Sequence, residues 1–365
     1  MKKTLLAALC FRGGFWIVFC LGLPLVGVRL AGEDLGSFFT FPPIVGKIGG
    51  SGMVLPVAIV YWILQGFLFL WLLWPRRDLV AIGTRTPQGG SKAFPAWGFA
   101  GILWLVLCWI LAWGRFEWFG WGQKFTFTPL WIGYILVVNS LIQFLRGTCP
   151  MFARPKLFLL LFPVSAGFWW VFEYYNRFVQ NWVYTDTGAG AWEYFLHASC
   201  AFSTVLPAVY STAEALRGFG GLQDRMTGPE LRFRRPRLVA WVVLSGSCLA
   251  FLFVGIHPRE LYPLLWTGPI LVWLCLSTLA GQAEDLGAID RGDWRVIWNW
   301  ALAALICGFF WEMWNFWSLV KWEYQVPYLH GALVFEMPLA GFLGYLPFGL
   351  ECFVVTRLCG IFSAE

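Results

Sequence analysis

The chain has 365 residues, of which 59% are hydrophobic and 13% are charged, and it carries a formal net charge of +6. Because soluble globular proteins carry about 25% charged residues, this composition excludes a single large soluble domain and indicates an integral membrane protein. The basic residues lie between long apolar runs, as the positive-inside rule expects of such a protein. The positive charge is therefore not a nucleic-acid signature, and we expect no nucleic-acid partner.

Ten apolar runs are long enough to cross a membrane, for which a helix needs about 20 residues. In chain order they are residues 14–30, 53–75, 94–114, 129–146, 155–176, 193–216, 237–256, 262–281, 294–317 and 332–357. The first run follows a basic start typical of a secretory signal, but no small-x-small cleavage site comes after it. We therefore interpret it as a retained helix. The sequence predicts an all-α fold, a polytopic transmembrane helical bundle of about ten spans.

The basic residues also predict the orientation of the bundle. With the N-terminus in the cytoplasm, 19 of the 26 Lys and Arg fall on cytoplasmic segments and the other 7 on outer segments. This asymmetry predicts that both termini are cytoplasmic, in what we interpret as a bacterial inner-membrane protein. The longest polar stretch, residues 218–236, is rich in Arg, Gly and Pro and is predicted to be a cytoplasmic basic linker. Contact with anionic lipids is its alternative role.

A Glu-x-x-Asn pair occurs twice, each time inside an apolar, Trp-rich run, and each time a Trp-x-Tyr triplet follows. The pairs are Glu173-Tyr174-Tyr175-Asn176 and Glu312-Met313-Trp314-Asn315, and the triplets are Trp182-Val183-Tyr184 and Trp322-Glu323-Tyr324. Placing a carboxyl inside a transmembrane segment costs free energy, so such a residue usually has a function. A duplicated one suggests two related half-units that build one site between them.

The order of the motifs predicts an internal duplication. A Trp-x-Gly triplet precedes each pair, at Trp131 and Trp266, and the offset between matching residues drifts only from 135 to 140. Each unit holds four spans, an even number, so the units share one orientation and form a tandem parallel repeat. The predicted domains are an N-terminal hairpin at 1–92, a first repeat at 93–217, the linker at 218–236 and a second repeat at 237–365. Chance similarity in a chain that is 19% aromatic is the alternative.

The carboxyls are candidates for acid–base chemistry. Glu and Asn three residues apart on a helix project from one face, and a buried carboxyl hydrogen-bonded by an amide is a candidate general acid. Two carboxyls in one cavity can divide the acid and base roles, and a third opens the last predicted span. The candidate catalytic residues are Glu173, Asn176, Glu312, Asn315 and Glu336. Alternatively, these polar side chains only cross-link helices.

Aromatic side chains crowd the same segments. Aromatic faces stabilise cations, so an acid with aromatic walls suits carbocation chemistry on an apolar polyene. The candidate substrate-binding residues are Trp170, Trp182, Tyr184, Trp311, Trp314, Trp322, Tyr324 and His330. For any one of them, packing or anchoring at the membrane interface is the alternative. Ten Cys without a Cys-x-x-Cys motif and three His without paired spacing predict no metal site and no cofactor.

These motifs resemble the membrane lycopene cyclases of carotenoid biosynthesis, which are duplicated membrane units. Glu312 would take the place of that family's first acid, residues 322–324 that of its aromatic triplet, and residues 336–338 the region of its second acidic motif. In the first unit Glu173, residues 182–184 and Glu193 would correspond, although neither unit carries the family's Pro-x-Glu-Glu motif. The resemblance implies a related fold and cofactor-free acid catalysis on a polyene, as in an isomerase-type cyclase.

Three functions follow from these observations. The first is a membrane enzyme, a cyclase or isomerase, that acts on an isoprenoid, a carotenoid or another lipid through its buried Glu residues. The second is a non-catalytic membrane subunit or scaffold that binds lipid, pigment or partner proteins. The third is a proton-linked transporter. The expected partners are a membrane lipid or isoprenoid and, in addition, a membrane-protein partner or a second copy of the chain in a homo-oligomer.

Overall fold

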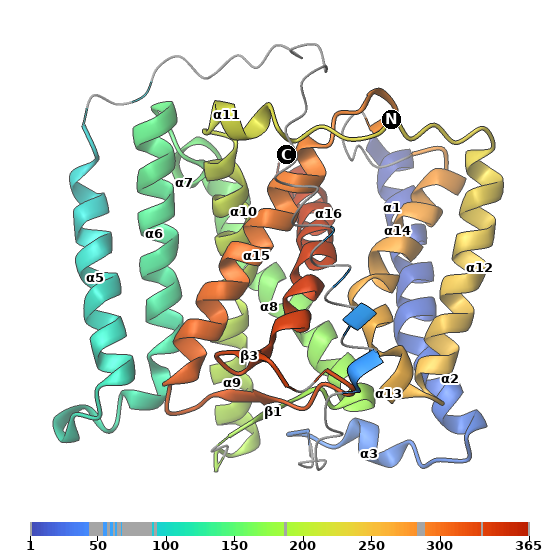
Figure 1. Ribbon diagram of the computed structural model, residues 1–365, viewed down its shortest axis with the longest axis horizontal. Helices are drawn as coiled ribbons and strands as arrows, with labels where there is room; N and C mark the ends of the chain where they lie inside the picture. Colours follow the sequence, from blue (N-terminus) through green and yellow to red (C-terminus); the bar gives the residue numbers. More distant parts are fainter. Residues whose placement is uncertain are drawn as a thin grey trace. The chain divides into compact units, whose positions relative to one another are not determined.

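The computed structural model describes residues 2–43, 93–185, 188–282, 289–329 and 331–363, together with residue 90 and isolated positions between 54 and 67. The described chain is mostly helical and divides into two compact units (Figure 1). Unit 1 comprises residues 1–46, 172–181 and 228–294, and unit 2 comprises residues 47–171, 182–227 and 295–365. These compact units are not the sequence repeats expected above, and the repeat boundaries stay a prediction.

Seven described helices are long and apolar enough to cross a membrane, so the chain is a helical membrane protein. They are Leu9–Leu30, Ala96–Trp113, Phe127–Arg146, Pro155–Val179, Pro236–Val254, Arg295–Phe316 and Leu339–Gly360. Each of the seven matches one of the ten apolar runs. An eighth run, 262–281, corresponds to the segments Pro258–Trp266 and Gly268–Leu279, which bend by 53° at their junction. The run at 53–75 falls largely outside the described residues.

The remaining run, 193–216, is not one continuous helix. It is broken into α9 (Ala191–Phe202) and α10 (Val205–Leu216). Pro207 supplies no backbone donor to the preceding turn. Ser165 of the neighbouring helix α8 (Pro155–Val179) compensates for the break, because its hydroxyl donates to the Phe202 carbonyl and accepts from the Leu206 N–H at 2.9 Å. The run at 193–216 is therefore two shorter helices, and its crossing of the membrane stays a prediction.

The last span begins later than predicted. Residues 333–338 form a hairpin of β3 (Leu333–Val334) and β4 (Met337–Pro338), with Val334 opposite Met337. The turn between them contains Phe335, whose φ of 58° lies in the left-handed region. Glu336 therefore sits in a hairpin turn ahead of the span and does not open the transmembrane helix.

In unit 1, glycine residues allow two helices to pack closely against each other. Its elements are α1 (Lys2–Ile17), the π-helical turn η1 (Val18–Gly22), α2 (Leu23–Leu30), α3 (Gly36–Phe39), α12 (Pro236–Val254), α13 (Pro258–Leu261), η4 (Tyr262–Trp266), α14 (Gly268–Leu279), η5 (Ile289–Arg291) and the end of α8. Helices α2 and α12 touch at Gly27 and Gly255. A Cβ on Gly27 would lie 2.0 Å from the Leu252 carbonyl oxygen, so only glycine permits this approach.

Polar side chains also join helices within unit 1. The buried Arg12 guanidinium on α1 donates to the Ser277 hydroxyl on α14 at 2.7 Å and lies 5.0 Å from the centre of the Trp273 ring. The Trp16 indole N–H donates to the Pro269 carbonyl at 3.0 Å. A polar contact of this kind is how an arginine inside an apolar helix is accommodated.

Unit 2 holds most of the chain. Its elements are α5 (Ala96–Trp113), η2 (Glu117–Phe119), η3 (Gln123–Phe125), α6 (Phe127–Arg146), α7 (Pro150–Ala153), the first part of α8 (Pro155–Val179), β1 (Trp182–Tyr184), α9, α10, α11 (Gly220–Gln223), α15 (Arg295–Phe316), β2 (Trp322–Tyr324), β3, β4, η6 (Leu339–Gly344) and α16 (Tyr345–Ser363). Helix α15 packs against both α10 and α16. Gly349 of α16 allows the second contact, because a Cβ there would lie 2.2 Å from the Trp300 carbonyl oxygen.

Two features of the structure bear on the expected duplication. Strands β1 and β2, the two Trp-x-Tyr triplets, pair with each other in antiparallel register, with Trp182 opposite Tyr324 and Tyr184 opposite Trp322. In addition, four pairs of elements begin 140 residues apart: α5 and α12 at 96 and 236, α8 and α15 at 155 and 295, β1 and β2 at 182 and 322, and α10 and α16 at 205 and 345.

Candidate functional site

The candidate site in unit 2 is centred on the carboxyl of Glu312, which α15 carries close to its C-terminal end and which has no solvent exposure. Its Oε1 atom accepts two hydrogen bonds, one from the Tyr345 hydroxyl at 2.6 Å and one from the Tyr324 hydroxyl at 2.8 Å. Its Oε2 atom is buried and has no hydrogen-bond partner among the described residues. Buried polar atoms are nearly always paired, so Oε2 is the atom that a ligand or a proton would reach.

Asn315 holds the strand that supplies one of these phenols. Its Nδ2 group donates to the Trp322 carbonyl at 2.8 Å, and its Oδ1 atom accepts from the Trp322 N–H at 2.9 Å. This two-point pairing fixes the start of β2, and Tyr324 follows two residues later. The Trp322 indole N–H then donates to the Tyr324 hydroxyl at 3.0 Å. The Glu-x-x-Asn pair and the Trp-x-Tyr triplet are thus parts of one hydrogen-bonded arrangement.

Gly308 makes room for the other phenol. It lies one helical turn before Glu312 on α15, and a Cβ at this position would come within 2.4 Å of the Tyr345 ring. The ring therefore rests against the backbone of α15, from where its hydroxyl reaches Oε1. Neither Gly308 nor Tyr345 was among the residues selected from the sequence. A tyrosine inside an otherwise apolar span is the signal that could have indicated Tyr345.

Tyr324 lies outside the membrane-spanning helices. Burial of its hydroxyl and, next, the nearby Glu312 carboxyl raise the pKa of Tyr324 well above the ordinary value of a phenol. The phenol is therefore protonated over the whole physiological range, and it acts as a hydrogen-bond donor to Glu312 at any pH at which the protein is expected to work.

A cluster of indole rings packs against Tyr345, one of the two phenols that donate to the carboxyl. The Trp311 ring lies 5.9 Å from that of Tyr345 and 5.0 Å from that of Trp131, and the Trp131 ring lies 5.1 Å from that of Trp314. Trp131, Trp311 and Trp314 are all buried. The indole N–H groups of Trp131 and Trp314 have no hydrogen-bond partner in the described part of the chain. The faces of such rings attract positive charge.

The first Glu-x-x-Asn pair belongs to unit 1. Glu173 and Asn176 are buried there. The neighbouring Phe172 stacks on Trp266 with ring centroids 5.0 Å apart, and the Tyr174 hydroxyl donates to the Leu21 carbonyl in the π-helical turn of η1. That Glu173 and Glu312 share one cavity stays a prediction.

The other residues selected from the sequence have varied surroundings. Trp170 donates to the Ser199 hydroxyl at 3.0 Å and stacks on Phe195 of α9. Trp182 and Tyr184 form β1, and Trp182 is buried. Glu336 forms an ion pair with Lys321. His330 lies outside the described residues.

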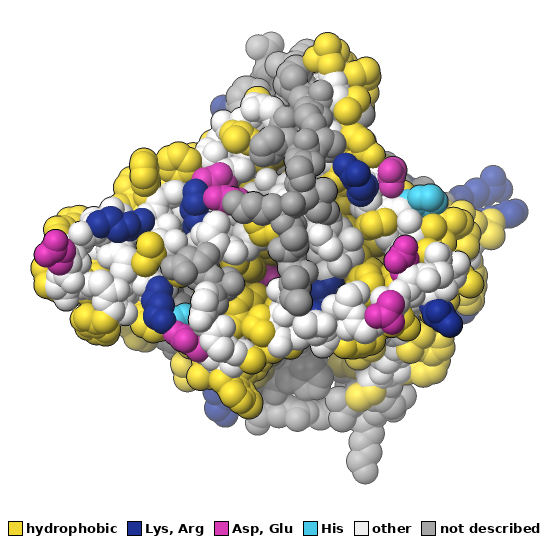
Figure 2. Space-filling view, turned by 90° about the horizontal axis from the view of Figure 1, so that it is seen from below, with side chains coloured by type: hydrophobic (Ala, Val, Ile, Leu, Met, Phe, Trp, Pro, Cys, Tyr) yellow, Lys and Arg dark blue, Asp and Glu magenta, His cyan; other side chains and the backbone are white. Residues whose placement is uncertain are grey.

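The end of unit 2 that carries the strands also contains charged pairs. Lys124 and Glu193 form an ion pair, and the lysine lowers the pKa of this exposed carboxyl. Figure 2 views the end that carries β1 and α9, and acidic and basic side chains are interspersed there among hydrophobic ones. The buried Glu312 carboxyl differs from these acids because both of its hydrogen-bond donors are neutral.

Comparison with known proteins identifies no family for this chain. No protein-family model, no curated protein and no solved structure matches the chain. Among the described residues, no group of three or more His, Cys, Asp or Glu side chains is arranged to hold a metal ion. The function is therefore inferred from the Glu312 site itself.

Proposed function

We propose that the protein is a membrane enzyme in which Glu312 acts as a general acid toward a carbon–carbon double bond of an apolar polyene. One observation carries this proposal: Oε1 of the buried carboxyl is held by two phenols, while Oε2 has no partner among the described residues. A carboxyl fixed at one oxygen presents the other in a defined direction. We infer that a substrate receiving the Oε2 proton would lie beside the cluster of Trp131, Trp311 and Trp314.

The reaction needs neither an oxidant nor a cofactor. The Glu312 proton forms a new C–H bond with the π electrons of one double bond, which leaves a carbocation next to it. The indole faces stabilise that charge, and a neighbouring double bond attacks it to close a ring. Loss of a proton from an adjacent carbon to a carboxylate then restores a double bond. The product is an isomer of the substrate, and preorganised hydrogen bonds to the carboxylate lower the barrier.

The proposed duplication gives Glu312 a counterpart in the chain. Antiparallel pairing of the two Trp-x-Tyr triplets and the common spacing of 140 residues between four pairs of elements support a parallel two-fold repeat. In such a repeat Glu173 is the counterpart of Glu312. We infer that the Glu312 carboxylate, once it has donated its proton, is the base that removes one from the adjacent carbon.

A second candidate function rests on what the Glu312 hydrogen bonds connect. They tie α15 to α16 through Tyr345 and to β2 through Tyr324. Interhelical hydrogen bonds of this kind stabilise membrane bundles by about 1 kcal/mol each. The same arrangement therefore fits a non-catalytic scaffold that binds a lipid or pigment in its aromatic surroundings.

Expression in a bacterium that accumulates lycopene, used here as the probe polyene, separates the two functions. An enzyme converts the probe to an isomer with a shifted retention time in liquid chromatography, and Glu312→Gln abolishes that conversion while the protein level is unchanged. A scaffold leaves the probe intact, and lipid copurifies equally with the wild type and Glu312→Gln. Equal conversion by the wild type and Glu312→Gln would show that the assignment of the acid is wrong.

A further inference from the structure

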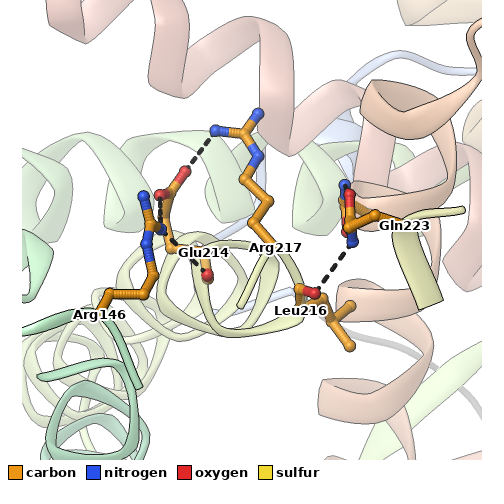
Figure 3. Close-up of polar contacts among 6 residues, drawn as sticks. Arg146, Glu214, Leu216, Arg217 and Gln223 are labelled. Carbon is orange, nitrogen blue, oxygen red and sulfur yellow. Dashed lines mark hydrogen bonds and ion pairs between the residues drawn. The ribbon is translucent and has the colours of Figure 1, made fainter. Parts of the chain in front are cut away.

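Two arginines flank one carboxylate, and a third arginine lies nearby, at the end of unit 2 that carries α7 and α11, away from the strands (Figure 1). Arg146 is the last residue of α6, Arg154 ends α7, and Arg217 follows the last residue of α10. Arg146 and Arg217 approach Glu214 from two sides (Figure 3). Their Nη1 atoms lie 2.9 Å and 2.6 Å from its Oε2 and Oε1 atoms, respectively.

The group has an excess of positive charge. Buried Ile142 of α6, Cys149 before α7 and Ala215 of α10 form one cluster, so the ends of these elements lie in one neighbourhood. The charges of all four groups act on the Tyr210 hydroxyl there. Three guanidinium charges against one carboxylate leave a net charge of +2. Repulsion between neighbouring guanidiniums is therefore only partly offset by Glu214, and an anion placed among them would be attracted.

The arginines also have unused N–H donors. A guanidinium carries five N–H donors, but the contacts of Arg146 and Arg217 to the described residues use a single nitrogen each, and the Arg154 side chain makes no hydrogen bond or ion pair to them. The Arg146 and Arg217 side chains are 29% and 38% exposed. These unused donors are thus accessible to a ligand, and their forked geometry matches the oxygens of a phosphate.

An exposed phenylalanine lies two residues from each arginine. Phe144, Phe152 and Phe219 are 37%, 57% and 44% exposed, next to Arg146, Arg154 and Arg217 in the sequence. A free phosphate ion gains nothing from exposed aromatic rings, whereas the glycerol and acyl chains of a lipid do. Spans α6 and α8 also end and begin here, so the arginines lie at the level of the lipid headgroups.

We propose that Arg146, Arg154 and Arg217 bind the phosphate of an anionic phospholipid headgroup. The phosphate oxygens accept from the unused guanidinium N–H groups, and the acyl chains run along the exposed phenylalanines. Each basic residue near the membrane surface contributes about 1 kcal/mol to attraction of an anionic lipid. This site is separate from the Glu312 site, and the proposal does not depend on the proposed reaction.

Native mass spectrometry of the full-length protein in detergent, titrated with phosphatidylglycerol or with phosphatidylcholine, tests this. We expect phosphatidylglycerol to bind more tightly, and Arg154→Gln to weaken its binding about fivefold, which corresponds to the loss of one basic residue. Arg154 is the position of choice because its side chain has no hydrogen bond or ion pair to the described residues. Arg154→Lys keeps the positive charge but lacks the forked guanidinium, so its affinity for phosphatidylglycerol should lie between those of the wild type and Arg154→Gln.

The control is Arg259→Gln, which removes an exposed arginine of α13 and should leave binding unchanged. Three results would overturn the proposal. They are equal binding of the two lipids, equal loss on Arg259→Gln and Arg154→Gln, and displacement of phosphatidylglycerol by inorganic phosphate at the same concentration. The last result would identify a site for free phosphate and not for a lipid.

Discussion

Two carboxylates of unit 2 have opposite surroundings. Glu312 is fully buried and receives hydrogen bonds from two neutral phenols. The Glu214 side chain is 14% exposed and contacts two guanidiniums. The charge of Glu214 is thus balanced by two cations, whereas the hydrogen-bond donors of Glu312 carry no charge. The difference in partners, more than the difference in burial, is why we propose Glu312 and not Glu214 as the acid of a reaction.

Substitution of each of the two carboxylates by Gln should give the largest difference in activity. We expect Glu312→Gln to reduce conversion of a polyene by about 10²–10⁴-fold, the usual contribution of a general acid, because an amide cannot supply the proton. Glu214→Gln should leave the conversion unchanged. Chromatography of membrane extracts measures both. Equal loss of activity in the two variants would remove the distinction drawn between these carboxylates.

The next largest effect should come from Gly308→Ala. The added methyl group would overlap the Tyr345 ring, so the ring must move and its hydroxyl leave the Glu312 carboxyl. A displacement of about 1 Å near a reacting group can cost about 100-fold in rate. Gly167→Ala is the matched control, since a Cβ on Gly167 meets nothing within 4 Å. A Gly308→Ala protein with full activity would show that the position of Tyr345 is unimportant.

Asn315→Ala should affect stability first. It removes both hydrogen bonds to the Trp322 backbone, and leaving such groups unpaired costs about 2 kcal/mol. Thermal unfolding in detergent, followed by tyrosine and tryptophan fluorescence, measures the loss. Ser318→Ala, which removes a single bond to the Trp314 carbonyl on the same helix, should cost less. Similar midpoints for both variants would argue against the role of Asn315 in holding β2.

Alkaline titration tests the Tyr324 donor. Because the folded-state pKa of Tyr324 is raised above the unfolded value near 10, its contribution to stability is fully present below pH 10. That contribution is lost as the pH rises from there toward the folded-state value. We expect Tyr324→Phe to have lower stability at neutral pH and a smaller decline of stability above pH 10 than the wild type. Parallel pH profiles for the two proteins would contradict this.

The smallest effect should be that of Glu214→Gln on stability, since partly exposed ion pairs contribute about 0–1 kcal/mol. The variant should nevertheless bind phosphatidylglycerol more tightly than the wild type, because the arginine group gains one net positive charge. Native mass spectrometry measures the change. Weaker binding would mean that Glu214 orients the arginines for the lipid and does not merely compete with it.

The sequence indicated one part of the site and not the other, for a physical reason. Glu312, Asn315, Trp322 and Tyr324 lie within 13 residues, so helix periodicity and a short loop suffice to relate them. Tyr345 and Gly308 are related only by the packing of α16 on α15, which no local pattern specifies. Hydropathy found seven of the predicted spans for a similar reason, since length and apolarity are local properties.

Two details of the fold that the apolar runs do not specify have the same origin. The break between α9 and α10 depends on Ser165, whose hydroxyl satisfies backbone groups of a different segment. The hairpin before the last span depends on pairing between β3 and β4, and its sequence is apolar enough to be included in the span. Both features are set by contacts between segments, and composition alone does not reveal them.

Solvent deuterium tests the role of Glu312 most directly. Purified protein is equilibrated in D₂O and incubated with lycopene, and the lipid product is analysed by mass spectrometry. A proton delivered from the Glu312 carboxyl should appear as one carbon-bound deuterium in the wild-type product, with no labelled product from Glu312→Gln. An unlabelled isomer from the wild type, or equal labelling by Glu312→Gln, would contradict proton transfer from this residue.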